Sequence, residues 1–304
     1  MNILVIGGNG FIGSHLVDIL LINGHAVRVF DSVYERYRKP LSNVDYRIST
    51  LENIPELYEA MLGIDIIFHL ASTSVPSTSN IDTVSDINKN LLPTLNILNL
   101  SVKLGIERIV YFSSGGAVYG IPVTTPINEN HPIQPISSYG IIKATIENYL
   151  FLYHRLYNTK PLIIRPSNPF GPRQGHYMAQ GVISTFLRKI KSREHITVFG
   201  DGNATKDYIY INDLIKQCYK LSFSDEVGVY NLGSGNGISI NQIIKQISKT
   251  TGITPEVIYS DVKNFDVNHF VLDITKVSGI LGTYPATSLE KGISETWNWI
   301  NSIS

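Results

Sequence analysis

The sequence has little of what marks secreted, membrane or nucleic-acid-binding proteins. Its 304 residues include one cysteine, Cys218, so no disulfide forms within the chain, which is typical of a reducing compartment. Basic and acidic side chains number 25 each, which gives no electrostatic reason to expect binding to nucleic acid or an anionic membrane. No apolar run approaches the roughly 20 residues of a transmembrane helix, and no secretory signal begins the sequence. We therefore expect a cytoplasmic globular protein that binds neither nucleic acid nor a membrane.

The first thirteen residues carry a pattern of glycines. An apolar run at residues 3–6 ends at Gly7, and Gly8, Gly10 and Gly13 follow before helical spacing of apolar residues begins. A short apolar run bounded by glycine is typical of a buried strand. Gly7 and Gly8 allow a tight turn, Gly10 lets the backbone approach a pyrophosphate, and Gly13 lets the helix pack closely, with its N-terminus toward the anion. The pattern predicts a dinucleotide site.

An acidic residue stands where such a site needs one. Asp31 follows a second apolar run and lies 18 residues beyond Gly13. In the dinucleotide-binding fold, an acid at this place accepts hydrogen bonds from the adenosine ribose and repels a 2′-phosphate. We therefore expect NAD. Arg36, Arg38 and Lys39 lie just downstream, and because a basic group can accept that phosphate, NADP stays open as the alternative.

Strand-like and helical segments alternate through the first half of the chain. We expect strands at residues 26–30, 44–48, 64–71, 109–112 and 161–164, and helices at residues 14–23, 54–62, 84–104 and 138–157. This alternation predicts an α/β fold with a doubly wound parallel sheet of the Rossmann type. Pro93 predicts a kink in one helix. His69 ends a strand with no other ligand-type residue beside it, so we expect no metal site.

The composition changes after Arg165, where irregular connections rich in glycine and proline begin. We expect residues 1–167 to form the NAD-binding domain, rejoined by about residues 206–232. Residues 168–304 would form mainly a smaller C-terminal α/β lobe for the substrate, with short strands at 196–200, 208–211 and 229–232 and helices at 240–250 and 289–300. The helix at 138–157 is apolar on more than one face, which indicates burial on more than one side.

Tyr139 and Lys143 are candidates for chemistry. They lie four residues apart at the start of a predicted helix, so their side chains point the same way. A tyrosine titrates near pH ~10, and a neighbouring ammonium lowers that pKa toward the range in which a base works well. The pair follows Ser113 and Ser114 at a strand end, and we interpret it as a site of proton transfer coupled to hydride transfer. The alternative is an ordinary surface helix.

These features together resemble a known family. The matching pieces are GGNGFIG at Gly7, Asp31, HLAS at His69, Asn90 with Thr94, FSSGGAVYG at Phe112, YGIIK at Tyr139, RPSNPFGP at Arg165 and GDGNATKDYIY at Gly200. The chain resembles the extended short-chain dehydrogenases/reductases, specifically the nucleoside-diphosphate-sugar epimerase/dehydratase family, over nearly its whole length.

The resemblance implies roles for individual residues. Tyr139 would be the base, with Lys143, Ser114 and Ser113 as the other catalytic residues. NAD would contact Gly7, Gly10, Phe11, Ile12, Gly13, Asp31, Thr50, Leu70, Ala71, Asn90, Ser113, Tyr139, Lys143 and Pro166. The nucleotide sugar would contact Ser114, Gly115, Tyr139, Asn168, Phe199, Lys206, Tyr208, Lys263 and Asp266.

The sequence departs from the family pattern at several positions. Gly115 stands where the family usually has Ser or Thr, so another donor must contact the reacting oxygen of the sugar, and we expect Ser114 to do so. Lys206 and Lys263 replace arginines, keeping the charge but losing the bidentate contact with phosphate. Thr50 replaces an acid that often contacts the adenine.

The resemblance also narrows the reaction. The 4,6-dehydratases of the family have Asp-Glu where this chain has Gly116 and Ala117, so we do not expect dehydration. We expect an NAD-dependent 4-epimerase of a UDP-hexose or UDP-N-acetylhexosamine, in a pathway to surface polysaccharide. A 4-ketoreductase that consumes NAD(P)H and a non-catalytic nucleotide-sensing protein are the alternatives. A homodimer through the helices at 84–104 and 138–157 is expected; the nucleotide and the sugar are left open.

Overall fold

The computed structural model describes residues 1–74, 79–175, 181–261, 269–283 and 286–303. The chain forms two compact units. The first comprises Met1–Ile121, Pro132–Arg165 and Ile215–Tyr230, and the second comprises Pro122–His131, Pro166–Leu214 and Asn231–Ser304.

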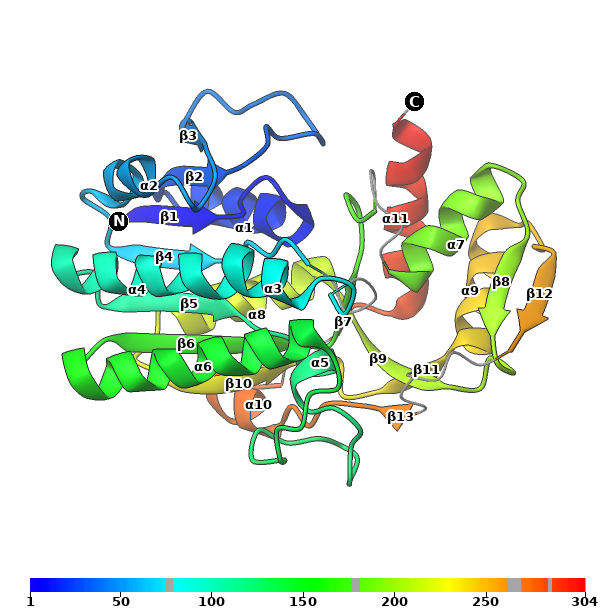
Figure 1. Cartoon of the computed structure of the whole chain (residues 1–304). Helices are drawn as coiled ribbons and strands as arrows, with labels where there is room; N and C mark the ends of the chain where they lie inside the picture. The colour runs from blue at the N-terminus through cyan, green and yellow to red at the C-terminus, as the bar shows by residue number, and fades with distance from the viewer. Residues whose placement is uncertain (75–78, 176–180, 262–268, 284–285, 304) are drawn as a thin grey trace. The chain divides into compact units, whose positions relative to one another are not determined.

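A seven-stranded sheet runs through the first unit (Figure 1). Its order is β10 (Gly228–Leu232), β6 (Lys160–Pro166), β5 (Arg108–Phe112), β4 (Ile66–His69), β1 (Asn2–Ile6), β2 (Ala26–Asp31) and β3 (Val44–Ile48). All neighbouring pairs from β6 to β3 are parallel. The strand order reverses between β1 and β4, the place where doubly wound sheets bind their ligands. The predicted fold class is confirmed.

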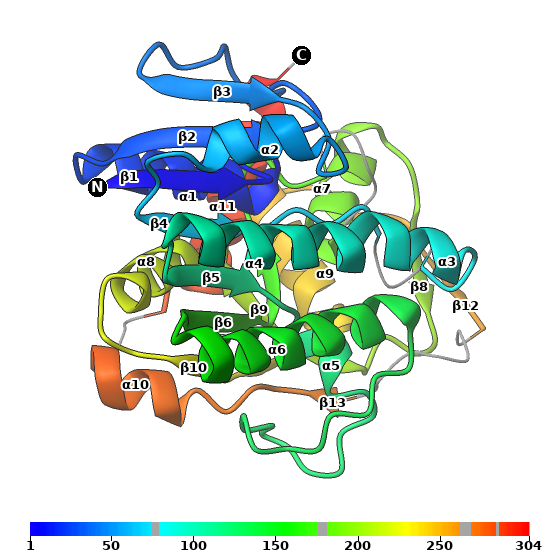
Figure 2. The ribbon, with the colours of Figure 1, turned by 60° about the vertical axis from the view of Figure 1, so that its left-hand side comes forward.

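Helices cover both faces of this sheet. Figure 2 shows α2 (Ile54–Met61), α4 (Leu92–Leu104) and α6 (Ser138–Tyr157) on the face toward the viewer, with α4 and α6 side by side. The opposite face carries α1 (Phe11–Ile22) and α8 (Ile211–Ser222). The core beneath α4 and α6 is formed by Leu98, Ile109, Tyr111, Ile142, Ile146, Leu150 and Ile163. The side of α6 that points to the sheet is apolar and packs against this core, and that packing stabilises the segment as a helix.

The predicted 84–104 helix is not one regular helix. It consists of α3 (Thr83–Asp86), a π-helical turn η1 (Ile87–Leu91) and α4. The helical backbone continues through all three pieces, and the π-helical turn directly precedes Pro93, whose ring and missing N–H disturb the turn before it. Short π-helical turns within helices often occur at functional sites.

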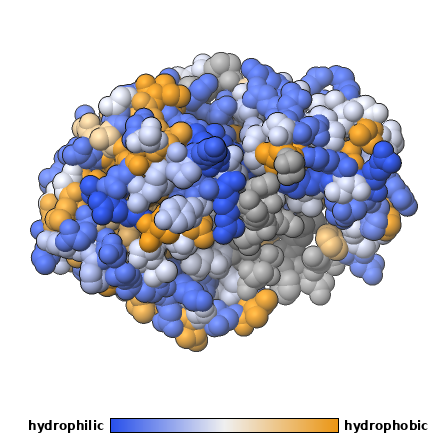
Figure 3. Space-filling model, turned by 90° about the horizontal axis from the view of Figure 1, so that it is seen from above, coloured by the Kyte–Doolittle hydropathy of each residue, from blue (hydrophilic) through white to orange (hydrophobic). Residues whose placement is uncertain are grey.

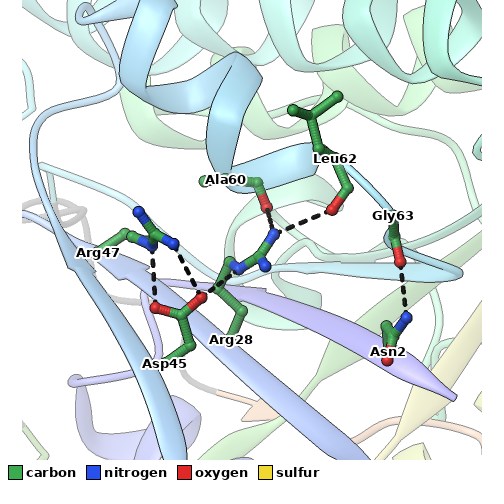
Figure 4. A network of polar contacts seen from close by, with 7 residues as sticks. All are labelled: Asn2, Arg28, Asp45, Arg47, Ala60, Leu62 and Gly63. Atoms are coloured by element: carbon green, nitrogen blue, oxygen red, sulfur yellow. Dashed lines mark hydrogen bonds and ion pairs between the residues drawn. The ribbon is translucent and has the colours of Figure 1, made fainter.

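Arg28 joins three elements at the other end of the sheet. As Figure 4 shows, its guanidinium on β2 donates to Asp45 Oδ2 on β3 at 2.7 Å and to the carbonyls of Ala60 and Leu62, at 2.9 and 3.1 Å, where α2 ends. Burial works to raise the pKa of Asp45, but hydrogen bonds from Arg47 and Arg28 outweigh it and hold the pKa below its ordinary value. Arg28 thus satisfies carbonyls that the helix end leaves open.

The second unit is built on short strands. β9 (Thr205–Tyr210) pairs with β11 (Gly237–Ser239), β13 (His269–Phe270) and β7 (Asn168–Phe170), and β8 (Ile196–Phe199) pairs with β12 (Val257–Ser260). Its helices are α7 (Val182–Lys191), α9 (Ile240–Thr251), α10 (Thr275–Leu281) and α11 (Leu289–Ser302). The predicted strands at 196–200 and 208–211 and the helices at 240–250 and 289–300 are present within a few residues. The sequence interpretation missed α7.

Apolar side chains on the molecular face drawn in Figure 3 form small patches between polar ones. Such scattered exposure is normal for a folded protein. Among the helices of the described residues, none has the length and apolar character needed to cross a bilayer.

Candidate functional site

The glycine loop between β1 and α1 has two glycines that the fold requires. Gly7 has φ +83°, and a Cβ there would lie 2.7 Å from the backbone nitrogen of Ala71. A Cβ on Gly13 would lie 2.2 Å from the carbonyl oxygen of Gly7. Both distances are far shorter than van der Waals contact, so these residues let β1, α1 and the segment after β4 pack together.

Gly10 differs from them. Its φ and ψ of −79° and 178° suit any residue, and the nearest atom to a Cβ would be Gly7 O at 3.4 Å. Gly10 is exposed and precedes α1, whose first residues Phe11 and Ile12 have N–H groups beyond the reach of helical carbonyls. The open surface in front of a helix N-terminus fits a pyrophosphate group, so the loop fits NAD.

Asp31 at the end of β2 is tied to this loop. Its Oδ2 accepts a hydrogen bond from the Asn9 backbone nitrogen at 3.0 Å, and its Oδ1 accepts one from Val33 at 3.2 Å. Burial raises the pKa of Asp31, against the effect of these backbone hydrogen bonds. The backbone of Ser32 also bonds to this carboxylate, and because a carboxylate has about four acceptor positions, room remains for a ribose hydroxyl.

The downstream cations differ in their surroundings, and Arg36 acts on Asp31 by its charge. Arg38 makes ion pairs with Asp18 and, at 2.7 Å, with Glu35. Lys39 and Arg36 are exposed. Thr50 is also exposed, two residues past β3, where its carbonyl accepts the N–H of Asn53 at 3.1 Å.

The residues after β4 pack against the glycine loop. The backbone nitrogens of Leu70 and Ala71 both donate to Ile6 O, at 2.9 and 3.1 Å. His69 Nε2 lies 2.9 Å from Thr94 Oγ1, and burial together with the charge of Lys143 lowers the pKa of His69 to about 3. Neutral His69 therefore packs in the core, and the described residues contain no cluster of three side chains able to hold a metal ion.

Tyr139 and Lys143 lie together as their spacing predicts. Lys143 Nζ lies 5.6 Å from the centre of the Tyr139 ring and 4.7 Å from that of Tyr111, and it donates to Phe112 O at 2.7 Å. Burial lowers the pKa of Lys143 to about 8. This geometry places an ammonium beside the phenol at the carboxyl end of β5.

The pKa of Tyr139 corrects the sequence analysis, which expected the ammonium to lower it. Although the side chain is partly exposed, the protein packed around the phenol raises its pKa to about 12, and a hydrogen bond with Ser114 opposes this effect. Desolvation disfavours the phenolate more than the surroundings favour it.

The paired serines face different partners. Ser114 precedes the short helix α5 (Gly115–Val118) without capping it, and its side chain bonds to Tyr139 instead. Ser113 Oγ donates to Glu147. A Cβ on Gly116 would meet no atom within 4 Å, so the chain leaves open space at this point.

A buried network behind Lys143 was not predicted from the sequence. Arg165, which is 2% exposed, donates to Glu147 Oε1 at 3.0 Å and Oε2 at 2.5 Å, and to the hydroxyl of Tyr119 at 2.9 Å. The sequence contains only a weak indication of this network, which is that Glu147 follows Lys143 by one helical turn. The network holds the middle of α6, which carries Glu147, against β6, which carries Arg165. The last residue of β6, Pro166, is buried.

The second unit contains a pocket of about 370 Å³. Four residues predicted to bind the nucleotide sugar line it: Asn168, Phe199, Lys206 and Tyr208. Residues that the sequence analysis did not name complete the lining, among them Val182, Thr185, Phe186, Thr197 and Ile240. Lys263 and Asp266 lie outside the described residues.

Alternation along β9 explains how Lys206 and Tyr208 reach the same pocket, because they are two residues apart on one strand. Between them, Asp207 points the other way and is buried. Its carboxylate accepts hydrogen bonds from Ser234 N at 2.8 Å and Leu272 N at 3.3 Å, which fix β9 in place. Asn168 Nδ2 donates to Asp207 O at 2.8 Å, which holds β7 beside it.

Comparisons with known proteins agree with this geometry. A Methanocaldococcus jannaschii protein provisionally named UDP-glucose 4-epimerase is 36% identical, over 99% of this chain and 98% of that protein. The structure of UDP-glucose 4-epimerase from Thermotoga maritima with UDP-glucose has a TM-score of 0.95 and 33% identity, covering 99% of each chain. The Escherichia coli dTDP-4-dehydro-6-deoxyglucose reductase is 32% identical, over 96% of this chain and 95% of the reductase.

The family model that matches is described as the NAD dependent epimerase/dehydratase family, and it covers residues 3–233. That range includes the glycine loop, Asp31 and the Tyr139–Lys143 pair. The chain therefore belongs to this family of enzymes, and NAD is its cofactor.

Proposed function

We propose that the protein is a 4-epimerase of a UDP-hexose or a UDP-N-acetylhexosamine. The observation that carries this proposal is the Tyr139 phenol, bonded to Ser114 and flanked by the Lys143 ammonium. The name of the Thermotoga maritima neighbour, which binds UDP-glucose, supports the choice of nucleotide.

Each residue has a role in this proposal. Tyr139 takes the proton of the 4-hydroxyl as the hydrogen on carbon 4 leaves as hydride, and later returns a proton to the 4-keto oxygen. Bound NAD would supply the hydride acceptor for this oxidation and the hydride donor for the reduction at the other face of carbon 4. Ser114 donates to the reacting oxygen, replacing the hydroxyl that Gly115 lacks. Lys143 would hold the cofactor ribose beside the phenol, whose pKa in the cofactor-free protein lies above its ordinary value.

The two units divide the binding tasks. We propose that the first holds NAD at Gly10, Asp31 and the segment after β4. The pocket of the second would hold the nucleotide, with Lys206 near the diphosphate. Tight binding of this remote part would retain the 4-keto sugar between the two hydride transfers.

Dehydration does not fit the site. A 4,6-dehydratase needs an acid and a base for carbons 5 and 6, and the matching positions, Gly116 and Ala117, have no titratable group. A 4-ketoreductase is the second candidate, favoured by the 32% identity with the Escherichia coli reductase. It would use the same Tyr139 and Lys143.

One experiment separates these reactions. The purified protein is incubated with UDP-glucose, UDP-galactose and their N-acetylated forms, and also with a 4-keto-6-deoxy nucleotide sugar and NADH. Interconversion of gluco and galacto forms without net change in nicotinamide absorbance supports the epimerase. Stoichiometric loss of NADH with the keto sugar supports the reductase, and no turnover of either contradicts both.

We also propose a homodimer formed through α4 and α6. The outer side of α6 exposes Ile141, Phe151, Leu152 and Leu156, each more than 40% exposed. Apolar exposure of this extent along one helix is typical of an interface. Sedimentation equilibrium should give twice the mass of the chain, and Leu152→Glu should give the monomer mass; a wild-type protein that sediments as a monomer contradicts the dimer.

A further inference from the structure

A buried carboxylate lies close to the proposed catalytic pair without belonging to it. Asp86 is the last residue of α3 and is 3% exposed. Its Oδ2 accepts a hydrogen bond from Ser138 Oγ at 2.6 Å, and its Oδ1 accepts bonds from Ser74 Oγ at 2.6 Å and Asn90 Nδ2 at 2.7 Å. These donors are all uncharged, so they satisfy the carboxylate without neutralising it.

The bonds of Asp86 join three separate segments. Ser138 opens α6 and directly precedes Tyr139. Asn90, in the π-helical turn, accepts the backbone N–H of Thr73 at 2.9 Å and thereby holds the segment after β4. Within η1, the same Asn90 amide also reaches Asp86 O at 3.2 Å. The position of the first turn of α6 therefore depends on this carboxylate.

The charge of Asp86 also acts on the pair, because it raises the pKa of Tyr139 as well as that of Lys143. Burial lowers the pKa of Lys143, whereas the charges of Glu147 and Asp86 raise it. Three other titratable groups lie around Lys143: Tyr139 on its own helix, Tyr111 on β5 and His69 on β4. In their neutral forms these groups add no negative charge to those of Glu147 and Asp86. The charges of Asp86 and Glu147 thus partly compensate the burial of this ammonium.

We propose that Asp86 is a positioning residue of the reaction: through its bond to Ser138 it fixes the first turn of α6 and with it Tyr139, and its carboxylate is a counter-charge to the Lys143 ammonium. This inference rests on the proposed function for its catalytic consequence only, because the placement and protonation of Lys143 can be measured without turnover.

Three variants separate geometry from charge. Asp86→Asn keeps the shape and removes the charge, Ser138→Ala removes one bond and keeps the charge, and Asp82→Asn is the matched control. Asp82 is an exposed carboxylate at the start of the same helix, where its Oδ1 accepts the Ser85 N–H at 2.9 Å. All three are compared with the wild type in NAD content, in kcat from pH 6 to 10, and in the titration of Lys143. The titration follows the 13C signal of labelled lysine, assigned with Lys143→Arg.

We expect Asp86→Asn to lower the measured pKa of Lys143 by about one unit and to move the alkaline limb of kcat down by a similar amount. Ser138→Ala should lower kcat about tenfold without moving the limb, because a misaligned base loses rate at every pH. Asp82→Asn should change none of these quantities.

An unchanged Lys143 titration in Asp86→Asn would overturn the charge role, and an unchanged kcat in Ser138→Ala would overturn the positioning role. If Asp86→Asn does not fold, Ser138→Ala and Ser74→Ala still test the positioning, since both retain the carboxylate. If the wild type shows no epimerase activity, the proposed function fails, while the titration still decides whether Asp86 controls Lys143.

Discussion

Ser113 donates a hydrogen bond from its hydroxyl to the buried carboxylate of Glu147. The adjacent hydroxyl of Ser114 is bonded instead to the Tyr139 phenol. Because successive residues of a strand end point to opposite sides, only one of the two serines faces the proposed reaction centre. The structural and catalytic contributions of the pair are therefore separable by mutation.

We predict that Ser114→Ala lowers kcat by two to three orders of magnitude, because loss of one donor to the reacting oxygen costs about 3–4 kcal/mol. Its stability and NAD content should match the wild type. Steady-state kinetics with the nucleotide sugar, with a cofactor assay of the purified protein, measures both.

Ser113→Ala is the matched control. It removes a donor from a buried carboxylate, so the free energy of unfolding should fall by about 1–3 kcal/mol while kcat changes only a few-fold. If Ser113→Ala loses the activity and Ser114→Ala keeps it, the two assignments must be exchanged.

The glycine loop offers a second pair of matched variants. Gly10→Ala should fold normally, because a Cβ there would meet no atom closer than 3.4 Å. It should weaken NAD binding about tenfold or more, since the methyl group fills the space in which the pyrophosphate approaches the backbone. Calorimetric titration of the cofactor-free protein with NAD measures the affinity.

Gly13→Ala should behave in the opposite way. Its Cβ would lie 2.2 Å from Gly7 O, so α1 must move away from β1, at a cost of about 1–3 kcal/mol or more. Thermal unfolding of the cofactor-free variants compares the two. A Gly10→Ala protein that binds NAD as tightly as the wild type would contradict the placement of the pyrophosphate.

Much of the first unit was predictable because its signals are local. Apolar runs bounded by glycine predicted the strands near β1 and β4, and the long helical pattern with apolar residues on more than one face predicted α6, which has the bounds Ser138–Tyr157. The spacing of Tyr139 and Lys143 was sufficient to place them together, since helical geometry fixes residues four apart on one face.

The rest depends on contacts between residues far apart in sequence. Asp86 meets Ser138 across 52 positions and Glu147 meets Arg165 across 18, and no local pattern marks either pair. The raised pKa of Tyr139 has the same origin, because the enclosure of the phenol arises only in the folded chain. β13, a strand of two residues, is too short for periodicity to indicate.

Lys143 predicts a pH dependence of stability. In the folded cofactor-free protein its pKa is lowered from 10.5 to about 8, so between these values the unfolded chain binds a proton that the folded chain has released. The free energy of unfolding must then rise with pH through this window. The lowering of the Lys143 pKa corresponds to a change of about 3 kcal/mol in the free energy of unfolding across this window.

Lys143→Met removes this contribution. At pH 7.5 the free energy of unfolding of this variant should exceed that of the wild type, and the difference should shrink steadily toward pH 10. Denaturant unfolding without NAD measures both free energies. Lys249→Met is the control, because that ammonium is exposed and pairs with Glu290 at 3.2 Å. Parallel stability profiles for wild type and Lys143→Met would show that the ammonium is not desolvated.

Lys206 tests the pocket of the second unit. It lines the pocket together with Asn168 and Tyr208, and we predict that it contributes charge to binding of the diphosphate. Lys206→Met should weaken binding of UDP about tenfold and raise KM for the nucleotide sugar by a similar factor, with kcat nearly unchanged. An interaction made equally in the ground and transition states affects KM alone.

Lys206→Arg sharpens the same test, because a guanidinium makes two parallel hydrogen bonds to phosphate where an ammonium makes a single directed contact. It should bind UDP at least as tightly as the wild type. Lys245→Met, which removes a charge from α9 outside this pocket, should leave UDP affinity unchanged. Equal UDP affinity in Lys206→Met and the wild type would mean that the diphosphate lies elsewhere, and that the pocket binds a different part of the substrate.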